Sequence, residues 1–260
     1  MKACYGDHVQ VTHERHVAVV TIDRAPHNFV SVEFMQNLAD ALDDADRDGM
    51  VRALVLQAEG KSFCAGADFA AQSDSVTTDP TGMPALYAEA IRIYSTQKPI
   101  VAAIQGPAVG AGLGLALAAD FRIASPDARF VANFVKLAFH PGFGITLALP
   151  RLIGEQKAAL MLLTGRRIKA ETALAWGLAD DLVSAEALRG AALALAAEIA
   201  ESGPLAIMAT RKTLRGDLAA QIRARTVLEY QQQEWLKTTQ DFKEGIRAVQ
   251  ERRPGNFRGR

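Results

Sequence analysis

The chain has 260 residues, of which 49% are hydrophobic and 22% charged, a composition typical of a globular protein with a substantial core. Lys and Arg together number 29, and Asp and Glu also number 29, which excludes a general electrostatic attraction to nucleic acid or to anionic membranes. The two cysteines form no CxxC pair and the N-terminal residues lack the apolar segment of a signal peptide, so we expect a protein of the reducing cytoplasm.

Predicted strands and helices alternate through the first hundred residues. Short apolar runs predict buried strands, and longer segments with apolar residues at helical spacing predict helices. In chain order these are the strand Val17–Ile22, the helix from Val32 to about Asp46, the strand Arg52–Gln57 and the helix Ala85–Thr96. Ser31 is the predicted N-cap of the first helix. A polar segment from Ala70 to about Pro84 precedes the second helix and is the least core-like part of the chain.

The stretch from Ile100 to Asp120 combines an apolar strand, a glycine turn and an apolar helix. Ile100–Ile104 predicts a buried strand, and Leu113–Ala119 predicts a helix of small residues. Glycines in the turn let another molecule approach the backbone, and the first N–H groups of a helix have no partner within it, so they can hold a developing negative charge. The stretch is about as long as a membrane span, but the Gly106-Pro107 pair interrupts it, which favours a protein core.

After Asp120 the predicted elements change from mixed to entirely helical in the last quarter of the chain. A further strand is predicted at Phe121–Ala124, and a glycine-rich loop, His140–Gly144, leads into a helix. The last quarter contains helical segments at Leu188–Glu201, Pro204–Arg215, Leu218–Thr238 and Asp241–Glu251. The predicted fold class is α/β with a helical C-terminal appendage, and we divide the chain into a core of residues 1–200 and a C-terminal region of residues 201–260.

Several well-known signatures are not matched. The three glycines of the turn form G-x-G-x-G rather than G-x-G-x-x-G, and Asp120 lies too close to bind a ribose, which argues against a dinucleotide site. No G-K-[ST] follows the turn and no G-x-S-x-G is present, which argues against a phosphate loop and a serine hydrolase. The sequence His13-Glu14-Arg15-His16 is one residue short of a zinc-protease motif, so no metal site is predicted.

Six segments in order resemble the enoyl-CoA hydratase/isomerase family of the crotonase superfamily. The two most specific are KSFCAGAD at Lys61–Asp68 and the glycine-rich segment from Lys98 to Asp120. The other four are Arg24-x-Pro26 with Asn28, Val51–Leu56, Leu163-Thr164-Gly165 with Trp176-Gly177-Leu178, and Arg252-Arg253-Pro254 with Asn256-Phe257. Each segment is weak alone, but their order over nearly the whole chain is a specific signal.

This resemblance implies a spiral of ββα units, with C-terminal helices that contribute to the CoA site and assemble a homotrimer or a dimer of trimers. It implies an acyl-CoA thioester as substrate, with no nucleic acid, membrane, metal or cofactor besides the coenzyme A of the substrate. The N–H groups of Ala67 and Ala111 would bind the thioester oxygen and stabilise an enolate. The residues expected to line the substrate site are Arg24, Phe63, Ala65, Gly66, Tyr87, Gly110, Gly114, Phe134 and Phe257.

The chain departs from the family at the positions of its catalytic acids. Hydratases of the family use two glutamates, at positions that are Gly114 and Phe134 here, and some isomerases use an acid at the position of Gly142. Asp68 and His140 are the candidate acid or base groups that remain. We expect an acyl-CoA-processing enzyme that stabilises a thioester enolate without the usual glutamate pair. The alternative is a non-catalytic acyl-CoA-binding protein that has lost its catalytic acids.

Overall fold

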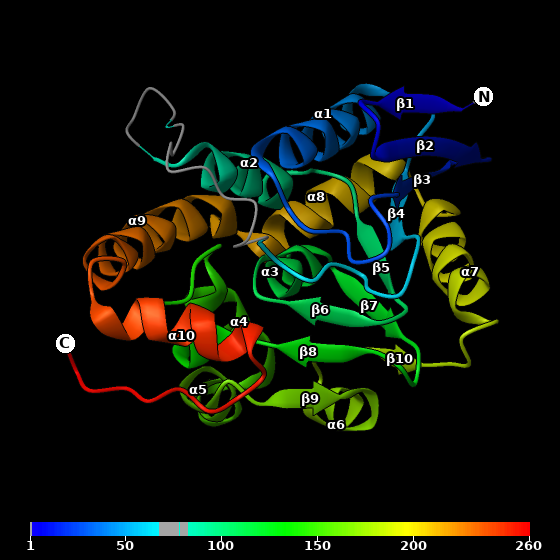
Figure 1. Cartoon of the computed structure of the whole chain (residues 1–260). Helices are drawn as coiled ribbons and strands as arrows, with labels where there is room; N and C mark the ends of the chain where they lie inside the picture. The colour runs from blue at the N-terminus through cyan, green and yellow to red at the C-terminus, as the bar shows by residue number, and fades with distance from the viewer. Residues whose placement is uncertain (1, 68–77, 79–82) are drawn as a thin grey trace.

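Figure 1 shows the computed structural model of the chain, which describes residues 2–67, 78 and 83–260. Its strands are β1 (Ala3–Tyr5), β2 (Val9–Glu14), β3 (Val17–Ile22), β4 (Ala53–Ala58), β5 (Ile100–Ile104), β6 (Pro107–Val109), β7 (Phe121–Ala124), β8 (Arg129–Val131), β9 (Arg167–Lys169) and β10 (Asp181–Leu182). Its helices are α1 (Val32–Arg47), α2 (Ala85–Tyr94), α3 (Ala111–Ala118), the 3-10 helix η1 (Asn133–Leu137), α4 (Ile145–Ile153), α5 (Glu155–Thr164), α6 (Ala170–Trp176), α7 (Leu188–Ala200), α8 (Pro204–Arg215), α9 (Leu218–Leu236) and α10 (Gln240–Gln250).

The larger of two sheets has the strand order β1-β2-β3-β4-β5-β7-β10. β1, β2 and β3 are antiparallel, whereas β3, β4, β5, β7 and β10 run parallel. Parallel neighbours need a crossover, and α1, α2 and α3 lie in the crossovers that lead to β4, β5 and β7. β5 is buried along its whole length, as expected for a parallel strand that is covered on both faces.

A smaller sheet, in the order β6-β8-β9, explains the spiral course of the chain. The chain passes from β5 in the large sheet to β6 in the small one, returns through α3 to β7, and crosses again to β8. This succession of strand, strand and helix confirms the predicted spiral of ββα units. It also places the turn between β6 and α3 where the second strand of one unit ends.

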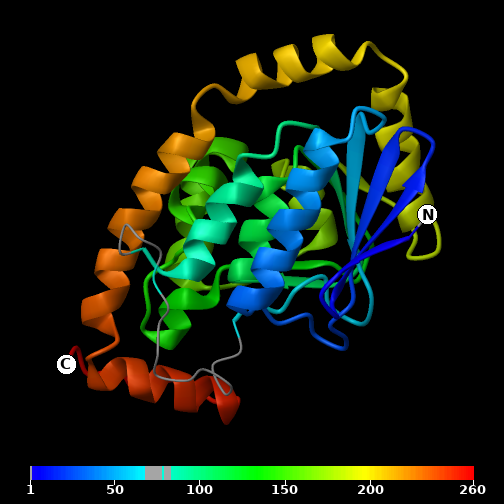
Figure 2. The same ribbon diagram turned by 90° about the horizontal axis from the view of Figure 1, so that it is seen from above.

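The large sheet lies between two layers of helices (Figure 2). On one face, α1, α2 and α3 cover a hydrophobic core to which α1 contributes the fully buried side chains of Phe34, Leu38 and Leu42. The other face is covered by α7, which packs through residues at every fourth position: Leu188, Ala192, Ala196 and Ala200. The three alanines let α7 lie close to the strands, so this face of the sheet also excludes water.

Charged side chains attach α8 to the rest of the chain. Of the α8 residues, all of which the structure describes, Arg211 alone is buried, and its Nε donates to Asp120 Oδ2 at 2.9 Å. Asp120 Oδ2 also accepts from Ile100 N at 2.8 Å, at the start of β5. Arg215 Nη2 donates to Ala118 O at 2.7 Å, at the C-terminal end of α3. These guanidinium groups lie where the partial negative charge of the α3 dipole favours cations.

The remaining C-terminal helices follow α8 along the outside of the molecule (Figure 2). α9 contacts α2 and α4, and α10 contacts η1. The division after residue 200 coincides with the end of α7, and a separate role for residues 201–260 stays a prediction. No single helix of the described residues has the length and apolar composition of a membrane span, although the bent pair Leu188–Ala200 and Pro204–Leu236, at 106°, passes that test jointly.

The predicted helices and strands are mostly confirmed, with shifted ends. Ser31 caps α1 as predicted, since its side chain accepts from Phe34 N at 3.2 Å. Two predictions at the glycine turn are wrong, because α3 begins at Ala111 rather than Leu113 and β6 replaces part of the expected turn. Gly110 explains the earlier start, since its φ of 54° redirects the chain directly before α3. The sequence does not predict the short elements β1, β9 and η1, because their apolar residues follow no clear periodicity.

We expect Arg211→Met to lower the free energy of unfolding by about 3 kcal/mol, because it leaves the carboxylate of Asp120 without its closest cation. The expected loss stays at the lower end of the range for a broken buried ion pair because Arg215 Nε, 3.6 Å from Asp120 Oδ1, remains. Urea unfolding measures this change. Lys212→Met, at an exposed position of the same helix, is the control and should change stability by less than about 0.5 kcal/mol. Equal stabilities of the two variants would contradict the assigned role of Arg211.

Candidate functional site

Two segments that are distant in the sequence meet backbone to backbone at the glycine turn. Cys64 and Ala108 form a parallel bridge, in which Val109 N donates to Cys64 O at 2.9 Å. A Cβ atom on Gly112 would lie 2.0 Å from Cys64 O, so a side chain at this position would push the two segments apart. The close approach therefore requires glycine at the second residue of α3.

The predicted donors Ala67 and Ala111 lie at this contact. A Cβ atom on Gly66 would lie 2.7 Å from Val109 O and 3.7 Å from Ala111 N, so the chain before Ala67 lies directly beside the start of α3. Val30 N donates to Gly66 O at 2.9 Å and fixes this segment from the other side. Ala67 and Ala111 are partly exposed, and neither N–H has a hydrogen-bond partner among the described residues. As the first residue of α3, Ala111 also presents the positive end of the helix.

A buried asparagine holds the loop after β3 against the segment after β4. Asn28 Oδ1 accepts from Arg24 N at 2.9 Å, and Asn28 Nδ2 donates to Glu59 O at 2.7 Å and to Ser62 O at 2.8 Å. Arg24 Nη1 donates to Phe29 O at 2.6 Å, so this predicted substrate-binding side chain is half-buried within its own loop. The loop is thereby connected to the segment that runs on into the glycine-turn contact.

Aromatic rings occupy the space at the two positions that lack the expected glutamates. A Cβ atom on Gly114 would lie 2.4 Å from Phe143 Cδ1 and 3.0 Å from Phe143 Cβ. Phe143 is 1% exposed, so its ring fills the space that a side chain at position 114 would need. Phe134 is partly exposed, and its Cζ lies 3.6 Å from the Cβ position of Gly110. The site beside α3 is therefore bounded by apolar rings at the two positions where the sequence lacks carboxyl groups.

Tyr87 reaches the loop before α4, where its hydroxyl group has a partner. Tyr87 Oη donates to Gln233 Oε1 at 2.6 Å, and Gln233 Nε2 donates to His140 O at 3.0 Å. A Cβ atom on Gly142 would lie 2.3 Å from Tyr87 Oη, so an acid could not be placed at Gly142 without moving this hydroxyl. Burial raises the pKa of Tyr87, which keeps the phenol protonated at neutral pH. The phenolic proton is thus used within the protein rather than offered to an acyl group.

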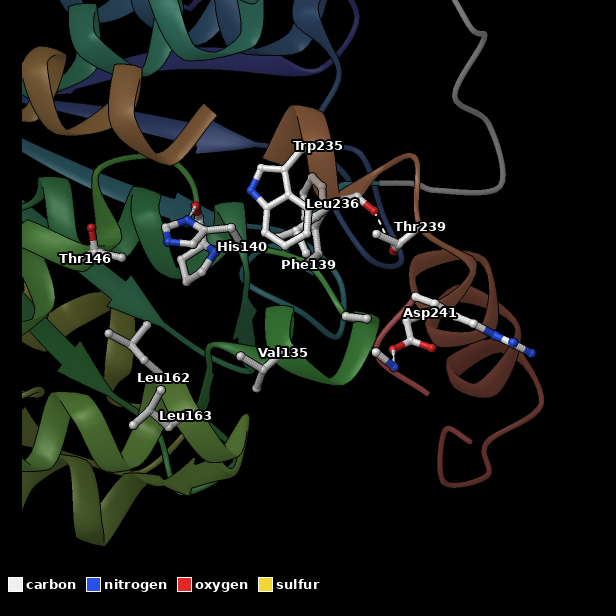
Figure 3. A pocket seen from close by; sticks show the side chains of 14 residues that line it. Val135, Phe139, His140, Thr146, Leu162, Leu163, Trp235, Leu236, Thr239 and Asp241 are labelled. Carbon is white, nitrogen blue, oxygen red and sulfur yellow. Dashed lines mark hydrogen bonds between the residues drawn. The ribbon is translucent and has the colours of Figure 1, made fainter. Parts of the chain in front are cut away.

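The imidazole of His140 faces a different pocket, shown in Figure 3. This pocket of about 540 Å³ is bordered by η1, α5, α9 and the C-terminal segment, with Leu163 and Trp235 among its apolar walls. Nδ1 of His140 lies 2.8 Å from Pro141 O, so this nitrogen carries a proton and donates it to the carbonyl. The residues that line the pocket include none from the glycine turn and neither predicted donor. The chain on its own therefore does not bring His140 to the Ala67–Ala111 contact.

The other predicted site residues are spread more widely. Asp68 lies outside the described residues. The side chain of Phe63 is fully buried in the core, whereas Ala65 is partly exposed. Phe257 lies after α10 and is 42% exposed. Burial raises the pKa of the Cys64 thiol to about 12, so this cysteine is protonated at neutral pH and is no nucleophile.

Two residues at this site are missing from the sequence-based expectations. Phe143 fills the space beside Gly114, and Glu229 of α9 accepts hydrogen bonds from Gly144 N and Thr146 N, at the start of α4. Neither position has a spacing that predicts these contacts, which span more than 80 residues in the case of Glu229. The available signal was Gly114, which stands where the resemblance implies a glutamate. Another part of the chain has to fill the space that a glutamate side chain would occupy.

Comparisons with known proteins agree with the geometry of the fold. Residues 12–260 match the family model described as enoyl-CoA hydratase/isomerase. The chain is 38% identical to (E)-benzylidenesuccinyl-CoA hydratase of Thauera aromatica, over 94% of this chain and 96% of that protein. It is 33% identical to 2,3-dehydroadipyl-CoA hydratase of Escherichia coli, over 96% of this chain and 98% of that protein.

A solved structure extends the likeness to the whole fold. The crystal structure of an enoyl-CoA hydratase/isomerase from Pseudoalteromonas atlantica superposes with a TM-score of 0.87 at 29% identity. The match covers 97% of this chain and all of that one. Sequence and fold therefore match the same group of proteins over nearly their full length.

We expect Gly114→Ala to lower the free energy of unfolding by about 1–3 kcal/mol, because the added methyl group collides with the ring of Phe143. Thermal or urea unfolding measures the loss. The double variant Phe143→Leu with Gly114→Ala should lose less unfolding free energy than the two single variants lose together. The difference, which is the coupling energy, should be about 1 kcal/mol. Gly190→Ala is the matched control, because a Cβ atom at this α7 position meets nothing within 4 Å and should be neutral or stabilising. Similar effects of the two alanine substitutions would contradict the assigned packing.

Proposed function

This chain belongs to the enoyl-CoA hydratase/isomerase family, and on that premise we propose that it binds the thioester carbonyl of an acyl-CoA between the N–H groups of Ala67 and Ala111. As a member of this family, the protein is an acyl-CoA-processing enzyme of the hydratase/isomerase type. The proposal adds which backbone groups of this chain contact the reacting carbonyl and which charge they stabilise.

One observation carries the proposal. Ala67 and Ala111 are partly exposed residues at a backbone contact between two segments, and their N–H groups have no partner among the described residues. Backbone donors that are fixed before substrate arrives need no reorganisation when charge develops on an oxygen atom. The start of α3 adds the positive end of a helix dipole to the Ala111 donor.

The proposed role is to stabilise an enolate. Removal of a proton from the α-carbon of a thioester transfers negative charge to the carbonyl oxygen, which then accepts from both N–H groups more strongly than the neutral carbonyl does. Each donor of this kind lowers an activation barrier by about 3–4 kcal/mol. The same arrangement serves hydration, double-bond migration and carbon–carbon chemistry, because all three can pass through an enolate.

The acid or base that moves the proton differs from a glutamate pair. Gly114 and Phe134 have no carboxyl group, and Phe143 fills the space next to Gly114. His140 lines the pocket of Figure 3, away from the two donors. We therefore propose a mechanism that does not use two glutamates, with Asp68 as a candidate because it directly follows Ala67 in the chain.

Assembly into a trimer or a dimer of trimers is the second part of the proposal. Leu163 is 75% exposed and Trp235 is 55% exposed, and both line the pocket of Figure 3. Exposed apolar side chains that gather at one pocket are typical of an interface between proteins. A second copy of the chain over this pocket would bury both side chains.

We expect Ala111→Pro to lower the rate of α-proton exchange by about 100- to 1000-fold, because proline has no N–H group to donate to the thioester oxygen. The measurement follows deuterium incorporation into butyryl-CoA and crotonyl-CoA in D₂O by mass spectrometry. The fold should persist, since proline is tolerated at the first position of a helix, where the N–H has no partner within the helix. Ala111→Gly keeps the N–H group and is the matched control.

The same experiment separates the enzyme from a protein that only binds acyl-CoA. Calorimetric binding of butyryl-CoA together with exchange at the uncatalysed rate, and no turnover of enoyl, branched or β-dicarbonyl CoA thioesters, would contradict the enolate mechanism. Equal exchange rates for Ala111→Pro and Ala111→Gly would contradict the role of the Ala111 N–H group. Exchange that persists in the wild type and in Ala111→Gly but is lost in Ala111→Pro supports the role of the Ala111 N–H group.

We expect Leu163→Glu to shift the protein to a smaller species in sedimentation velocity, because a carboxylate at the pocket of Figure 3 disfavours an apolar interface. Met50→Glu, at a position that is 64% exposed and outside this pocket, is the control and should leave the assembly unchanged. A wild-type protein that sediments as a monomer would contradict the assembly proposal.

A further inference from the structure

The segment Gly142–Gly144 fits between α3 on one side and α2 with α9 on the other. A Cβ atom on Gly142 would lie 2.7 Å from Gln233 Nε2, and one on Gly144 would lie 2.6 Å from Ile222 Cδ1. Between the two glycines, Phe143 points the opposite way and fills the space beside Gly114. The segment therefore transmits the position of α9 to α3 through direct contacts.

The conformation of this segment requires support from its surroundings. Phe143 has a φ of 66° and Gly144 a φ of 70°, so two successive residues lie in the left-handed region. Glycine adopts such angles freely, but a phenylalanine does so only where the rest of the structure holds it. The ring of Phe143 packs against Tyr94 of α2, with centroids 6.5 Å apart. The residues on either side of Phe143 are held by contacts from α9.

The first of these contacts is a buried carboxylate. Glu229 is 1% exposed, its Oε2 accepts from Gly144 N at 2.7 Å, and its Oε1 accepts from Thr146 N at 2.9 Å and from Thr146 Oγ1 at 2.6 Å. Gly144 is the N-cap of α4 and has no side chain to cap it, so Glu229 supplies the cap from 85 residues away. Burial raises the pKa of this carboxyl, and its hydrogen bonds to Thr146 and Gly144 oppose the shift.

The second contact lies one helical turn further along α9. Gln233 Nε2 donates to His140 O at 3.0 Å, and Gln233 Oε1 accepts from Tyr87 Oη at 2.6 Å. Residues four apart lie on the same side of a helix, so Glu229 and Gln233 face the same loop. Glu229 holds the end of residues 140–146, and Gln233 holds their beginning.

We propose that Glu229 and Gln233 of α9 are positioning residues of the thioester site, which hold Phe143 against Gly114 and thereby fix the first turn of α3. The inference rests on the proposed role of Ala111 N–H as a donor to the thioester oxygen. Gly114 N donates to Gly110 O at 3.1 Å, the hydrogen bond that closes the first turn of α3 around Ala111. Phe143 packs on the residue that makes this bond, so a shift of the ring redirects the Ala111 N–H group.

This arrangement gives the C-terminal helices a part in the reaction without a side chain that touches the substrate. Glu229 and Gln233 act through Phe143, and Phe143 acts through Gly114. A small displacement of a fixed donor weakens its bond to a developing oxyanion much more than it weakens binding of the CoA portion. We therefore expect loss of the contacts to lower kcat and to leave KM nearly unchanged.

The test compares variants of the full-length protein with cinnamoyl-CoA as a spectroscopic probe. Polarisation of its conjugated thioester carbonyl moves the absorption band to longer wavelength, so the red shift on binding reports the strength of the donors. In Glu229→Gln, a single amide oxygen replaces the two carboxylate oxygens that accept from Gly144 and Thr146. The new amide N–H groups would face donors of the loop and could not replace the lost hydrogen bonds. We expect a smaller red shift and a fall in kcat for crotonyl-CoA of about 10- to 100-fold, with KM changed less than threefold.

Two further variants keep the test decisive. Glu234→Gln is the matched control, since Glu234 lies on the same helix, is half-exposed and pairs with Lys237 at 3.0 Å; it should leave the red shift and kcat at wild-type values. Should Glu229→Gln unfold, Tyr87→Phe removes only the hydroxyl that holds Gln233, and it should reduce the red shift in the folded protein. Tyr87→Phe combined with Gln233→Leu should lose no more than Gln233→Leu alone, because both act through one contact.

The possible results separate this inference from the proposal on which it rests. No red shift in the wild-type protein would overturn the proposed donors. A wild-type red shift that is unchanged in folded Glu229→Gln and Tyr87→Phe would overturn the positioning role and leave the donors intact. A reduced red shift with a normal KM, absent in Glu234→Gln, supports the role, since a loss of stability alone does not change the polarity at a bound carbonyl.

Discussion

The contact between Cys64 and Gly112 is the constraint on which the rest of this structure depends. A carbonyl oxygen lies where the side chain of residue 112 would be, so the two segments share one space that only glycine leaves open. The bridge between Cys64 and Ala108 and the left-handed turn at Gly110 follow from the same approach. Without it, the segment that ends at Ala67 and the start of α3 at Ala111 would lie apart, and the proposed thioester site would not form.

Helix ends and buried charges extend this constraint through the molecule. Arg215 binds the last carbonyl of α3, and Arg211 joins α8 to Asp120 just beyond that helix. Glu229 of α9 binds the first N–H groups of α4. In each case the charge has the sign that the helix dipole favours. Helices α8 and α9 are therefore attached to the core by directional contacts at helix ends.

Much of the fold was predictable because its signals are local. Continuous apolar runs identify β3 and β5, a serine before an amphipathic segment identifies the start of α1, and the loss of strands after β10 identifies the helical C-terminal region. The glycine turn was also predictable as a place where N–H groups point outward. The start of α3 was misplaced by two residues, because Gly112 and Gly110 look like turn residues when the carbonyl that faces Gly112 is unknown.

The sequence by itself determined the alternation of strands and helices, the place of the two glycine-containing segments and the absence of carboxyl groups at Gly114 and Phe134. Each of these depends on residue type and on spacing within one segment. Only the tertiary structure decided what fills the space beside Gly114, which partner binds Tyr87, and that His140 faces another pocket. Those outcomes depend on contacts between residues 29 to 146 positions apart, and such contacts follow from how the helices pack rather than from any local pattern.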